Sequence, residues 1–414
     1  MRRTRIAALT TTFILLALAP AGSASAARAA PDSTALSSGA LSTATRPRHL
    51  DPVADTQLVL PEPTGPDRIG TVTLHLIDRS RPDPWVPSEP HRELMVQLWY
   101  PARHTRGQSR APWVSPAVAN LLNPPGSGFI LPVTHGHVGA PIDRGRHPVV
   151  LYSPGFGLER TSGTAMVEQL ASHGYVVVTI DHPHDANLVE FPDGRVAEHA
   201  VPQPTDPADA EAAIERAVDV RVADTRFTLD QLSAVNRGDN PDAGRRPLPR
   251  GITGSLDLSR VGMFGASLGG ATAAAAMLAD RRIRAGVNLD GTLFGPVLDH
   301  GLDRPFLQFG SELADGDEPD ETWTALWERL RGPRLELQIT GAAHLSFTDL
   351  HTLVQQSGLP ADELAEQFGT IDAARSIDIQ RAYLRAFFDR HLDRREGRLL
   401  DRPSPRFPEV VFVR

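Results

Sequence analysis

The chain has no cysteine and no lysine among its 414 residues. Without cysteine it can form neither a disulfide bond nor a lipid-modified cysteine anchor, so its stability must come from packing. Without lysine it can use neither a Schiff-base mechanism nor a serine–lysine catalytic pair. Several families of hydrolases and lyases are excluded before any motif is considered.

Basic residues are fewer than acidic ones, 42 against 50, and aromatic residues are present at an ordinary level. The net charge is −8, and aromatic residues make up 6% of the chain. No basic run is interleaved with aromatic side chains, so nucleic acid is not an expected partner. Hydrophobic residues make up 41% of the sequence, which is ordinary for a globular protein and sufficient for a sizeable core.

The first 26 residues have the pattern of a secretory signal peptide. They contain a positive start, an apolar stretch and a small-residue cleavage site, which are Arg2, Arg3 and Arg5, then Ile6 to Ala19, then Ala24-Ser25-Ala26. A transmembrane anchor is the alternative, but it needs about 20 apolar residues. We expect cleavage after residue 26, export from the cytoplasm and no stable membrane span.

The rest of the chain divides into a short tail and one domain. Residues 27–66 are rich in Ala, Ser, Thr and Pro and lack periodicity, which predicts a flexible mature N-terminus. Alternating apolar residues predict strands at 70–78 and 93–101, which form an antiparallel edge. Continuous apolar runs at 148–153 and 174–181 predict strands buried on both faces of a parallel sheet.

Strands and helices alternate regularly from residue 261 onward. The pattern predicts strands at 261–264, 285–289, 305–309 and 334–340 and helices at 267–279, 321–330 and 371–391, in addition to a helix at 160–173 between the two earlier strands. This alternation predicts a single α/β domain over 67–414, with a mostly parallel, doubly wound sheet.

Residues 192–258 interrupt the regular alternation. They are dense in Pro, Asp, Gly and Arg around one predicted helix at 207–232. Two interpretations remain open for this segment. It is either an insertion beside or over the active site, or a surface crossover helix with its loops.

The pentapeptide Gly265-Ala266-Ser267-Leu268-Gly269 lies between a predicted strand and a predicted helix. A serine on a sharp strand-to-helix turn is the nucleophile elbow of α/β-hydrolases, and the glycines leave room where strand and helix pass close together. The bare pattern can arise by chance. Its interpretation therefore depends on partners for Ser267.

An acid and a base follow later strands in the required order. Asp290 directly follows the strand at 285–289, and His344 follows the strand at 334–340. The order Ser, Asp, His is that of α/β-hydrolases, and the carboxyl ends of parallel strands share one sheet edge. We predict a catalytic triad of Ser267, Asp290 and His344, with Asp299 and Asp303 as solvated carboxylates.

An oxyanion hole needs two N–H groups aimed at the developing negative charge. Leu268 follows the nucleophile at a helix N-terminus and supplies one. The turn Ser153-Pro154-Gly155-Phe156-Gly157 supplies the other, and because Pro154 has no N–H, Phe156 is the predicted donor. An ordinary turn between strand and helix is the alternative for residues 153–157.

These segments together resemble the plasma-type (isoform II) platelet-activating factor acetylhydrolase family. The resemblance extends from about Gly70 to His391 and includes the glycine turn, the elbow and three further segments, which are Leu170-Ala171-Ser172-His173-Gly174-Tyr175, Asn288-Leu289-Asp290-Gly291 and His344-Leu345-Ser346-Phe347-Thr348-Asp349. It implies an α/β-hydrolase fold with Asp290 as acid and His344 as base. Bacterial cutinase-like lipases and polyester hydrolases share this architecture.

The resemblance also implies a reaction and limits what is known of its substrate. It implies hydrolysis of a short acyl ester, and an ester on a phospholipid is one option. The chain has Ala266 and Pro154 where the family usually has histidine, so the polar lining of the pocket differs. A lipase or cutinase-like polyester hydrolase, an amide hydrolase and a catalytically idle lipid-binding fold remain alternatives.

No cofactor and no metal are expected. His135 and His137, and likewise His182 and His184, have close spacing but lack a third ligand in sequence. The acidic run at 315–321 lacks the spacing of a calcium loop and is expected to cap the following helix. The expected partner is a small-molecule ester or lipid, and the sequence leaves the oligomeric state open.

Overall fold

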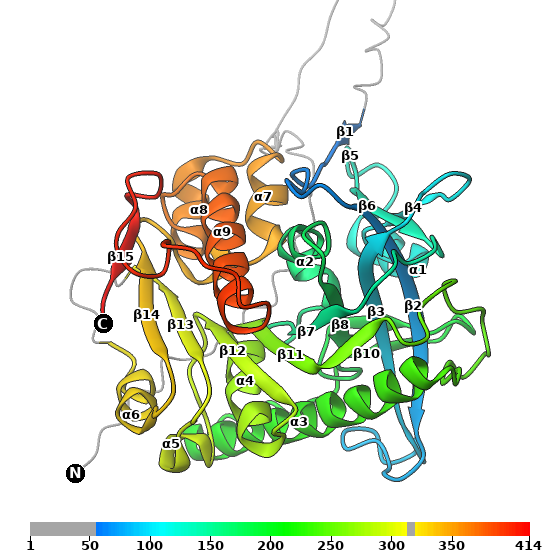
Figure 1. The fold of residues 1–414 in the computed structure, drawn as a ribbon, viewed down its shortest axis with the longest axis horizontal. Coiled ribbons are helices and arrows are strands. Elements are labelled where there is room, and N and C mark those ends of the chain that lie inside the picture. Colours follow the sequence, from blue (N-terminus) through cyan, green and yellow to red (C-terminus); the bar gives the residue numbers. More distant parts are fainter. Residues whose placement is uncertain (1–54, 313–318) are drawn as a thin grey trace, which may run out of the picture.

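The computed structural model describes residues 55–312 and 319–414 (Figure 1). The expected signal peptide at 1–26, most of the segment 27–66 and part of the acidic run lie outside the described residues. The described chain is built around an eleven-stranded sheet with helices on both faces.

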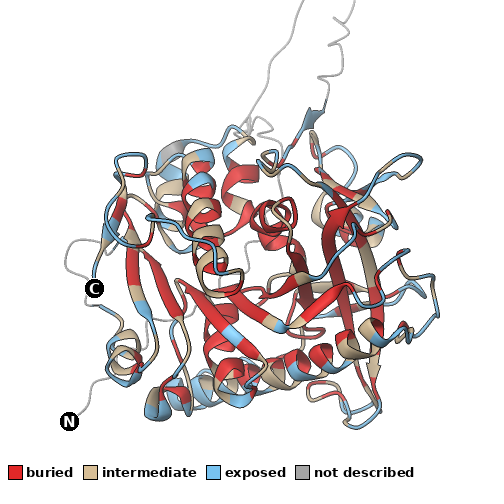
Figure 2. Ribbon diagram, in the orientation of Figure 1, coloured by how far each residue is buried: buried red, intermediate tan, exposed pale blue. Residues whose placement is uncertain are grey.

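The middle of the sheet is parallel. Its strands, in spatial order, are β8 (Val176–Asp181), β7 (His147–Ser153), β11 (Leu256–Ala266), β12 (Ile283–Leu289), β13 (Phe306–Ser311) and β14 (Arg334–Ile339). They run through the buried centre of the molecule (Figure 2), as their continuous apolar sequences predict. The predicted α/β fold is confirmed.

The direction in which the chain crosses the sheet reverses at β7. The next strand, β8, lies on one side of β7, and β11 lies on the other. Ligands of open α/β sheets bind outside the carboxyl ends of the strands at such a switch point. The fold therefore singles out the edge where β7 and β11 end.

Antiparallel strands close both ends of the sheet. As predicted, β2 (Arg68–Asp78) and β3 (Arg92–Ala102) form a long antiparallel pair. Beyond them lie β6 (Val133–Val138) and β4 (Arg110–Pro112). At the other end β15 (Val410–Phe412) pairs with β14. These short strands carry too few residues for a recognisable alternation.

The sheet is the middle of three layers. On one face it packs against α3 (Pro207–Arg237), α4 (Leu268–Ala279), α5 (Val297–His300) and α6 (Glu321–Arg329). On the other face it packs against α2 (Thr164–Ala171) and α9 (Ala373–His391). Two hydrophobic cores result, one on each side of the sheet.

Helix α3 is an integral part of the first core. Asp206 accepts a hydrogen bond from Ala208 N at its start, and Gly238 adopts a left-handed conformation at its end. The helix packs along α4 and buries Val218, Leu229 and Leu232 against the sheet. Of the two interpretations of residues 192–258, α3 fits the crossover helix.

The N-terminal side of the domain differs from the expectation. Residues 55–66 belong to the segment predicted to be flexible, yet Leu58 and Leu60 are 1% and 4% exposed. Strand β1 (Thr56–Gln57) pairs with β5 (Phe129–Ile130). The segment packs because its two leucines fill a small separate core, and the folded part extends to at least Thr56 rather than starting near residue 67.

Short elements connect this framework. They are α1 (Pro116–Leu122), the 3₁₀ helix η1 (Arg160–Gly163), β9 (Leu188–Glu190), β10 (Val196–Glu198), the 3₁₀ helix η2 (His344–Phe347), α7 (Asp349–Gln355) and α8 (Ala361–Phe368). Among the described residues, no helix combines the length and apolar character needed to cross a membrane.

Candidate active site

Ser267 lies on a strained turn between β11 and α4. Its φ of 54° and ψ of −125° are unusual for a residue with a side chain. A Cβ atom added to Gly269 would lie 1.9 Å from Ser153 O, and one added to Gly265 would lie 2.3 Å from Gly269 C. Only glycine fits at both positions, which explains the spacing of the pentapeptide.

The strand register converges on this serine. Strand β11 lies between β7 and β12, with Gly265 opposite Ser153 and Ala266 opposite Leu289. The chain continues from Ser153 into the glycine turn and from Leu289 into Asp290. The elbow, the turn and the predicted acid therefore lie at one edge of the sheet.

Asp290 accepts hydrogen bonds from three groups. His344 Nδ1 lies 2.7 Å from Oδ2, and Ser311 N and Oγ lie 2.7 and 2.9 Å from Oδ1. Burial disfavours the charged form, but the bond and charge of His344 and the donors of Ser311 outweigh it, so the pKa of Asp290 is lowered. The carboxylate is ionised and fixed in place.

The turn after Asp290 is fixed by a buried asparagine. Asn288 Nδ2 donates to Gly291 O at 2.7 Å, and Gly291 N donates to Asn288 Oδ1 at 3.0 Å. Asp290 itself has a φ of 54°. These two bonds hold a backbone conformation that a side chain normally avoids, and they direct the carboxylate toward His344.

His344 begins η2, directly after β14 and its following turn. Because Asp290 accepts a hydrogen bond from Nδ1, neutral His344 carries its proton on Nδ1 and leaves Nε2 free to accept one. Desolvation opposes a positive charge on the ring, but the bond and charge of Asp290 outweigh it and raise the pKa of His344. The side chain is 48% exposed.

The predicted triad residues are brought to one place, although not every contact is made. Asp290 and His344 are joined directly. A Cβ atom on Gly291 would lie 2.1 Å from Ser267 O, so the acid turn packs against the elbow. In the described part of the chain, no hydrogen bond joins Ser267 Oγ to His344. Asp303 lies elsewhere and pairs with Arg281 and Arg304.

The two predicted oxyanion donors border the same serine. Leu268 N is in the first turn of α4, and a Cβ atom on Gly155, next to Phe156, would lie 3.5 Å from Ser267 Cβ. Neither Phe156 N–H nor Leu268 N–H has an acceptor among the described residues. Unpartnered N–H groups beside the predicted nucleophile suit a developing oxyanion.

Phe156 also forms part of a wall beside the site. Its ring is half-buried and meets the His199 ring edge-on, with 5.2 Å between the centroids. His199 Nδ1 donates to Asp185 O at 2.7 Å. Phe156 therefore packs against His199, which directly follows β10 and is bonded to the loop after β8.

A buried polar network that the motifs did not reveal surrounds the glycine turn. Ser153 Oγ lies 3.0 Å from His182 Nε2, and His182 Nδ1 lies 2.9 Å from Asp224 Oδ2. Asp224 is also paired with the buried Arg92. The partners are far apart in sequence, so no local motif reveals them. The signal in the sequence for this network is that arginine and aspartate interrupt the apolar face of the helix predicted at 207–232.

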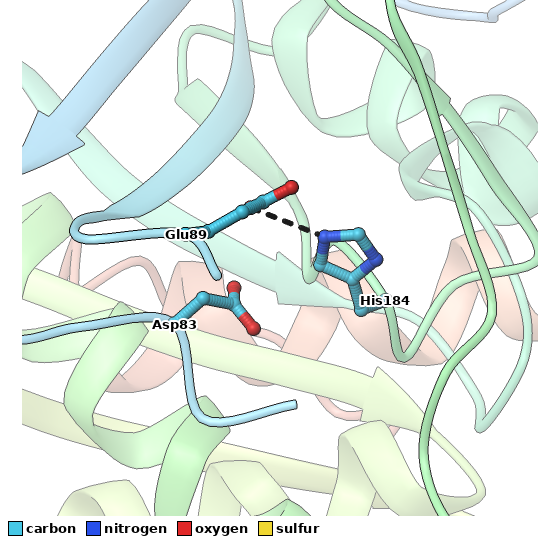
Figure 3. Close-up of side chains that lie close together, drawn as sticks. All are labelled: Asp83, Glu89 and His184. Carbon is cyan, nitrogen blue, oxygen red and sulfur yellow. Dashed lines mark hydrogen bonds and ion pairs between the residues drawn. The ribbon is translucent and has the colours of Figure 1, made fainter. Parts of the chain in front are cut away.

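One group of side chains in the described ranges offers three possible metal ligands, which are Asp83, Glu89 and His184 (Figure 3). Asp83 is already engaged, because Oδ1 accepts from Trp85 N and from Val86 N, and Oδ2 accepts from Arg92 Nη1. A cation bound there would face the buried Arg92 guanidinium, so the donor set fits a metal poorly.

The other paired histidine motif also has structural partners. His135 Nδ1 lies 2.7 Å from Glu168 Oε2, and His137 Nδ1 lies 3.4 Å from Ile69 O. The two rings are therefore held by different groups, a carboxylate of α2 and a carbonyl of β2.

Comparisons with known proteins show the family to which the chain belongs. The family described as platelet-activating factor acetylhydrolase, isoform II, matches residues 85–399. A protein of Arthroderma benhamiae named probable 1-alkyl-2-acetylglycerophosphocholine esterase is 31% identical over 389 residues, covering 86% of this chain and 94% of that protein. The platelet-activating factor acetylhydrolase of Cavia porcellus is 24% identical over 283 residues, covering 64% of each chain.

A solved structure is similar over most of the chain. The ferulic acid esterase from Streptomyces cinnamoneus has a TM-score of 0.74 and 36% sequence identity, covering 87% of this chain and 100% of that one. The overall fold described above is thus shared with a protein named as an esterase.

Proposed function

The chain belongs to the isoform II platelet-activating factor acetylhydrolase family and is an ester hydrolase, and we propose that Ser267, Asp290 and His344 perform the hydrolysis. The observation that carries the proposal is the 2.7 Å contact of His344 Nδ1 with Asp290 at the sheet edge that holds Ser267. An acid, a base and a strained serine at one edge are the parts that acyl transfer requires.

The first half of the reaction forms an acyl-enzyme. His344 Nε2 takes the proton from Ser267 Oγ as that oxygen attacks the ester carbonyl. Asp290 stabilises the imidazolium, while Phe156 N–H and Leu268 N–H stabilise the carbonyl oxygen as it becomes negative. His344 then protonates the departing alcohol, and the acyl group remains on Ser267.

The second half returns the enzyme to its starting state. His344 takes a proton from a water molecule, and the resulting nucleophile attacks the acyl carbonyl. The same two N–H groups stabilise the second oxyanion, and Ser267 Oγ regains the proton from His344. The products are one alcohol and one carboxylic acid.

We further propose short acyl esters, including esters on a glycerophospholipid, as substrates. Support comes from the family match and from the Arthroderma benhamiae protein, which is named for an acetylglycerophosphocholine. A second candidate is a hydroxycinnamate ester, because the chain is 36% identical to a protein named ferulic acid esterase. Comparing kcat/KM for a phospholipid acetate, a simple acetate and methyl ferulate separates the candidates.

We also propose that the protein acts outside the cytoplasm. The support is the pattern of residues 1–26, with arginines before an apolar stretch and small residues at its end. Expression of the full chain, with sequencing of the N-terminus of any exported protein, tests the proposal. An exported protein starting at Ala27 is the expected result, and a protein that keeps Met1 in the cytoplasm would contradict it.

The function is tested with Ser267→Ala and a matched control, Ser233→Ala. Ser233 Oγ donates to Leu229 O within α3, far in sequence from the elbow. On a chromogenic acetate ester we expect Ser267→Ala to lower kcat by about 10³-fold or more and Ser233→Ala to retain the wild-type rate. Wild-type activity in Ser267→Ala would rule out the assignment.

A further inference from the structure

Arg221 on α3 is wholly buried and binds the glycine turn. Its Nη1 donates to Pro154 O at 2.5 Å, and its Nη2 donates to Gly155 O at 3.1 Å. Its side chain is 0% exposed. A charged group is rarely buried unless it is paired, so the chain must provide a counter-charge.

Asp185, in the loop after β8, supplies that counter-charge. Arg221 Nε and Nη2 donate to its two carboxylate oxygens at 2.7 and 2.5 Å. This two-pronged contact fixes the plane of the guanidinium. The remaining donors then point in set directions, toward the backbone of residues 154 and 155. The turn is thus held by a rigid fork rather than by a flexible charge.

The contact at Gly155 also fixes the direction of Phe156 N–H. Gly155 C=O and Phe156 N–H belong to the same peptide unit, which is planar and trans, and the described chain has no cis peptide bond. In a trans peptide the C=O and N–H bonds point in opposite directions. Holding Gly155 O against Arg221 therefore directs Phe156 N–H away from α3.

That direction is where an oxyanion donor is needed. Gly155 lies against Ser267, with 3.5 Å between its added Cβ atom and Ser267 Cβ. Phe156 N–H has no acceptor among the described residues. A buried cation on the carbonyl side of the peptide also polarises it and strengthens the N–H as a donor.

A second contact from α3 holds the start of the same turn. Asp224 lies three residues after Arg221 and therefore on the same side of the helix. It binds His182, which contacts Ser153 Oγ at 3.0 Å. The helix thus restrains residues 153–155 from one side through two buried charged groups.

We propose that Arg221, held by Asp185, is a positioning residue that orients Phe156 N–H for the oxyanion. The inference rests on the proposed function, because it assumes an oxyanion formed at Ser267. Lysine cannot replace Arg221, since a single ammonium group lacks the planar fork that binds Asp185 and two carbonyls together.

The test compares Arg221→Lys with Arg381→Lys. Arg381 is a matched control because it is also buried and also donates to backbone carbonyls, those of Ala165, Glu62 and Pro61. Asp185→Asn is a second variant that keeps Arg221 and the side-chain volume. It provides the same comparison if the lysine variant does not fold.

Each variant is assayed on an oxygen ester and on the matching thionoester. The rates are expressed per active site, and the active sites are counted by titration with a fluorophosphonate. Sulfur accepts hydrogen bonds weakly, so the thionoester depends less on the oxyanion hole. We expect Arg221→Lys to lower kcat for the oxygen ester by about 10- to 100-fold with little change in KM. The ratio of ester to thionoester rates should fall in Arg221→Lys and Asp185→Asn and remain at the wild-type value in Arg381→Lys.

Two outcomes would overturn the inference. Equal losses on both substrates would show that Arg221 merely supports the fold, and an unchanged kcat would show that the turn needs no support from it. Either result, together with an inactive Ser267→Ala enzyme, would reject the role of Arg221 and leave the proposed function standing. An active Ser267→Ala enzyme would reject the proposed function itself.

Discussion

At the scale of single residues, the proposed role of His344 as the base makes its protonation state set the pH range of activity. Only the neutral imidazole can take the proton of Ser267. The Asp290 carboxylate raises the pKa of His344 above its ordinary value of 6.5, even though desolvation acts in the opposite direction. Because the protonated form is inactive, activity is lost as the pH falls through this raised pKa.

The first prediction concerns this acid limb. In the wild-type enzyme, the midpoint of the acid limb of kcat/KM should lie above pH 6.5, the ordinary pKa of histidine. Asp290→Asn removes the negative charge, so its midpoint should move to lower pH, and kcat should fall by about 10³- to 10⁴-fold. Steady-state rates from pH 5 to 9 measure both effects, with an exposed carboxylate variant, Asp239→Asn, as control. An acid limb at the same pH in Asp290→Asn would contradict the account.

The second prediction concerns the elbow glycines. Alanine at Gly269 would place a Cβ atom 1.9 Å from Ser153 O, and a backbone atom cannot move away cheaply. Gly269→Ala should lower the free energy of unfolding by about 3 kcal/mol or more. The matched change Gly397→Ala meets no atom within 4 Å and should have little effect. Urea denaturation of both variants checks the difference, and equal stabilities would contradict it.

The residues of the candidate site differ in how readily the sequence predicts them. Ser267, Asp290 and His344 each follow a strand, so strand order alone placed them at one sheet edge. Arg221 follows no strand and lies in the middle of a helix, and its contacts with Pro154 and Gly155 are 67 and 66 residues away. Its role depends on how α3 packs, which local patterns do not contain.

At the scale of elements, the loop that carries His344 is joined to α2 through a buried carboxyl group. Asp349, the first residue of α7, is 0% exposed. Ala165 N, in the first turn of α2, lies 3.2 Å from both of its carboxyl oxygens. Burial raises the pKa of Asp349 to about 8, with nearby Glu168 raising it further and Arg381 opposing the change. The group is therefore largely protonated at neutral pH in the folded state.

The third prediction follows from that pKa. The folded pKa of about 8 lies above the reference value of 3.8. At a pH between these two values, the folded state therefore holds a proton that the unfolded state has lost. Stability from this group is complete below the lower value and is lost as the pH rises toward the upper one. Asp349→Asn should remove that dependence, which is at most about 1.4 kcal/mol per pH unit.

Urea denaturation at several values between pH 5 and 8 measures this effect. The free energy of unfolding of Asp349→Asn, relative to wild type, should increase with pH. The exposed control Asp239→Asn should follow the wild-type slope. Parallel curves for Asp349→Asn and wild type would show that Asp349 is ionised in the folded protein.

The elements themselves were predictable in proportion to their length and burial. Strands β7 and β12 and helix α4 have largely apolar sequences, and their predicted ranges, 148–153, 285–289 and 267–279, lie within two residues of the observed ends. Strands β9 and β15 have three residues each, too few for a pattern. Helix α3 is predicted from the sequence, but its packing against the sheet is not, because the sequence around it has the composition of a loop.

At the scale of the whole molecule, the sheet arranges the site and the segment 55–66 closes one side of the domain. Arg381 on α9 donates to the carbonyls of Glu62 and Pro61 at 2.9 and 2.8 Å. Gln169 on α2 binds Thr64. The sequence predicted one α/β domain correctly, whereas proline and polar residues in 55–66 concealed the packing of Leu58 and Leu60.

The fourth prediction tests this segment. A chain that starts at Asp67 loses the burial of Leu58 and Leu60, which is worth about 1.5–3 kcal/mol for each side chain. It should unfold at a lower temperature than a chain that starts at Asp55. Calorimetry of the two chains gives the comparison, and identical midpoints would show that the segment contributes nothing to the stability of the domain.

The central claim is that Ser267 carries the acyl group during hydrolysis. The most direct measurement is mass spectrometry of peptides from enzyme quenched with acid during turnover of an acetate ester. The account predicts one added acetyl group, found on the peptide and residue of Ser267 and absent from Ser267→Ala. An acetyl group on another residue, or hydrolysis at the full rate in Ser267→Ala, would contradict it.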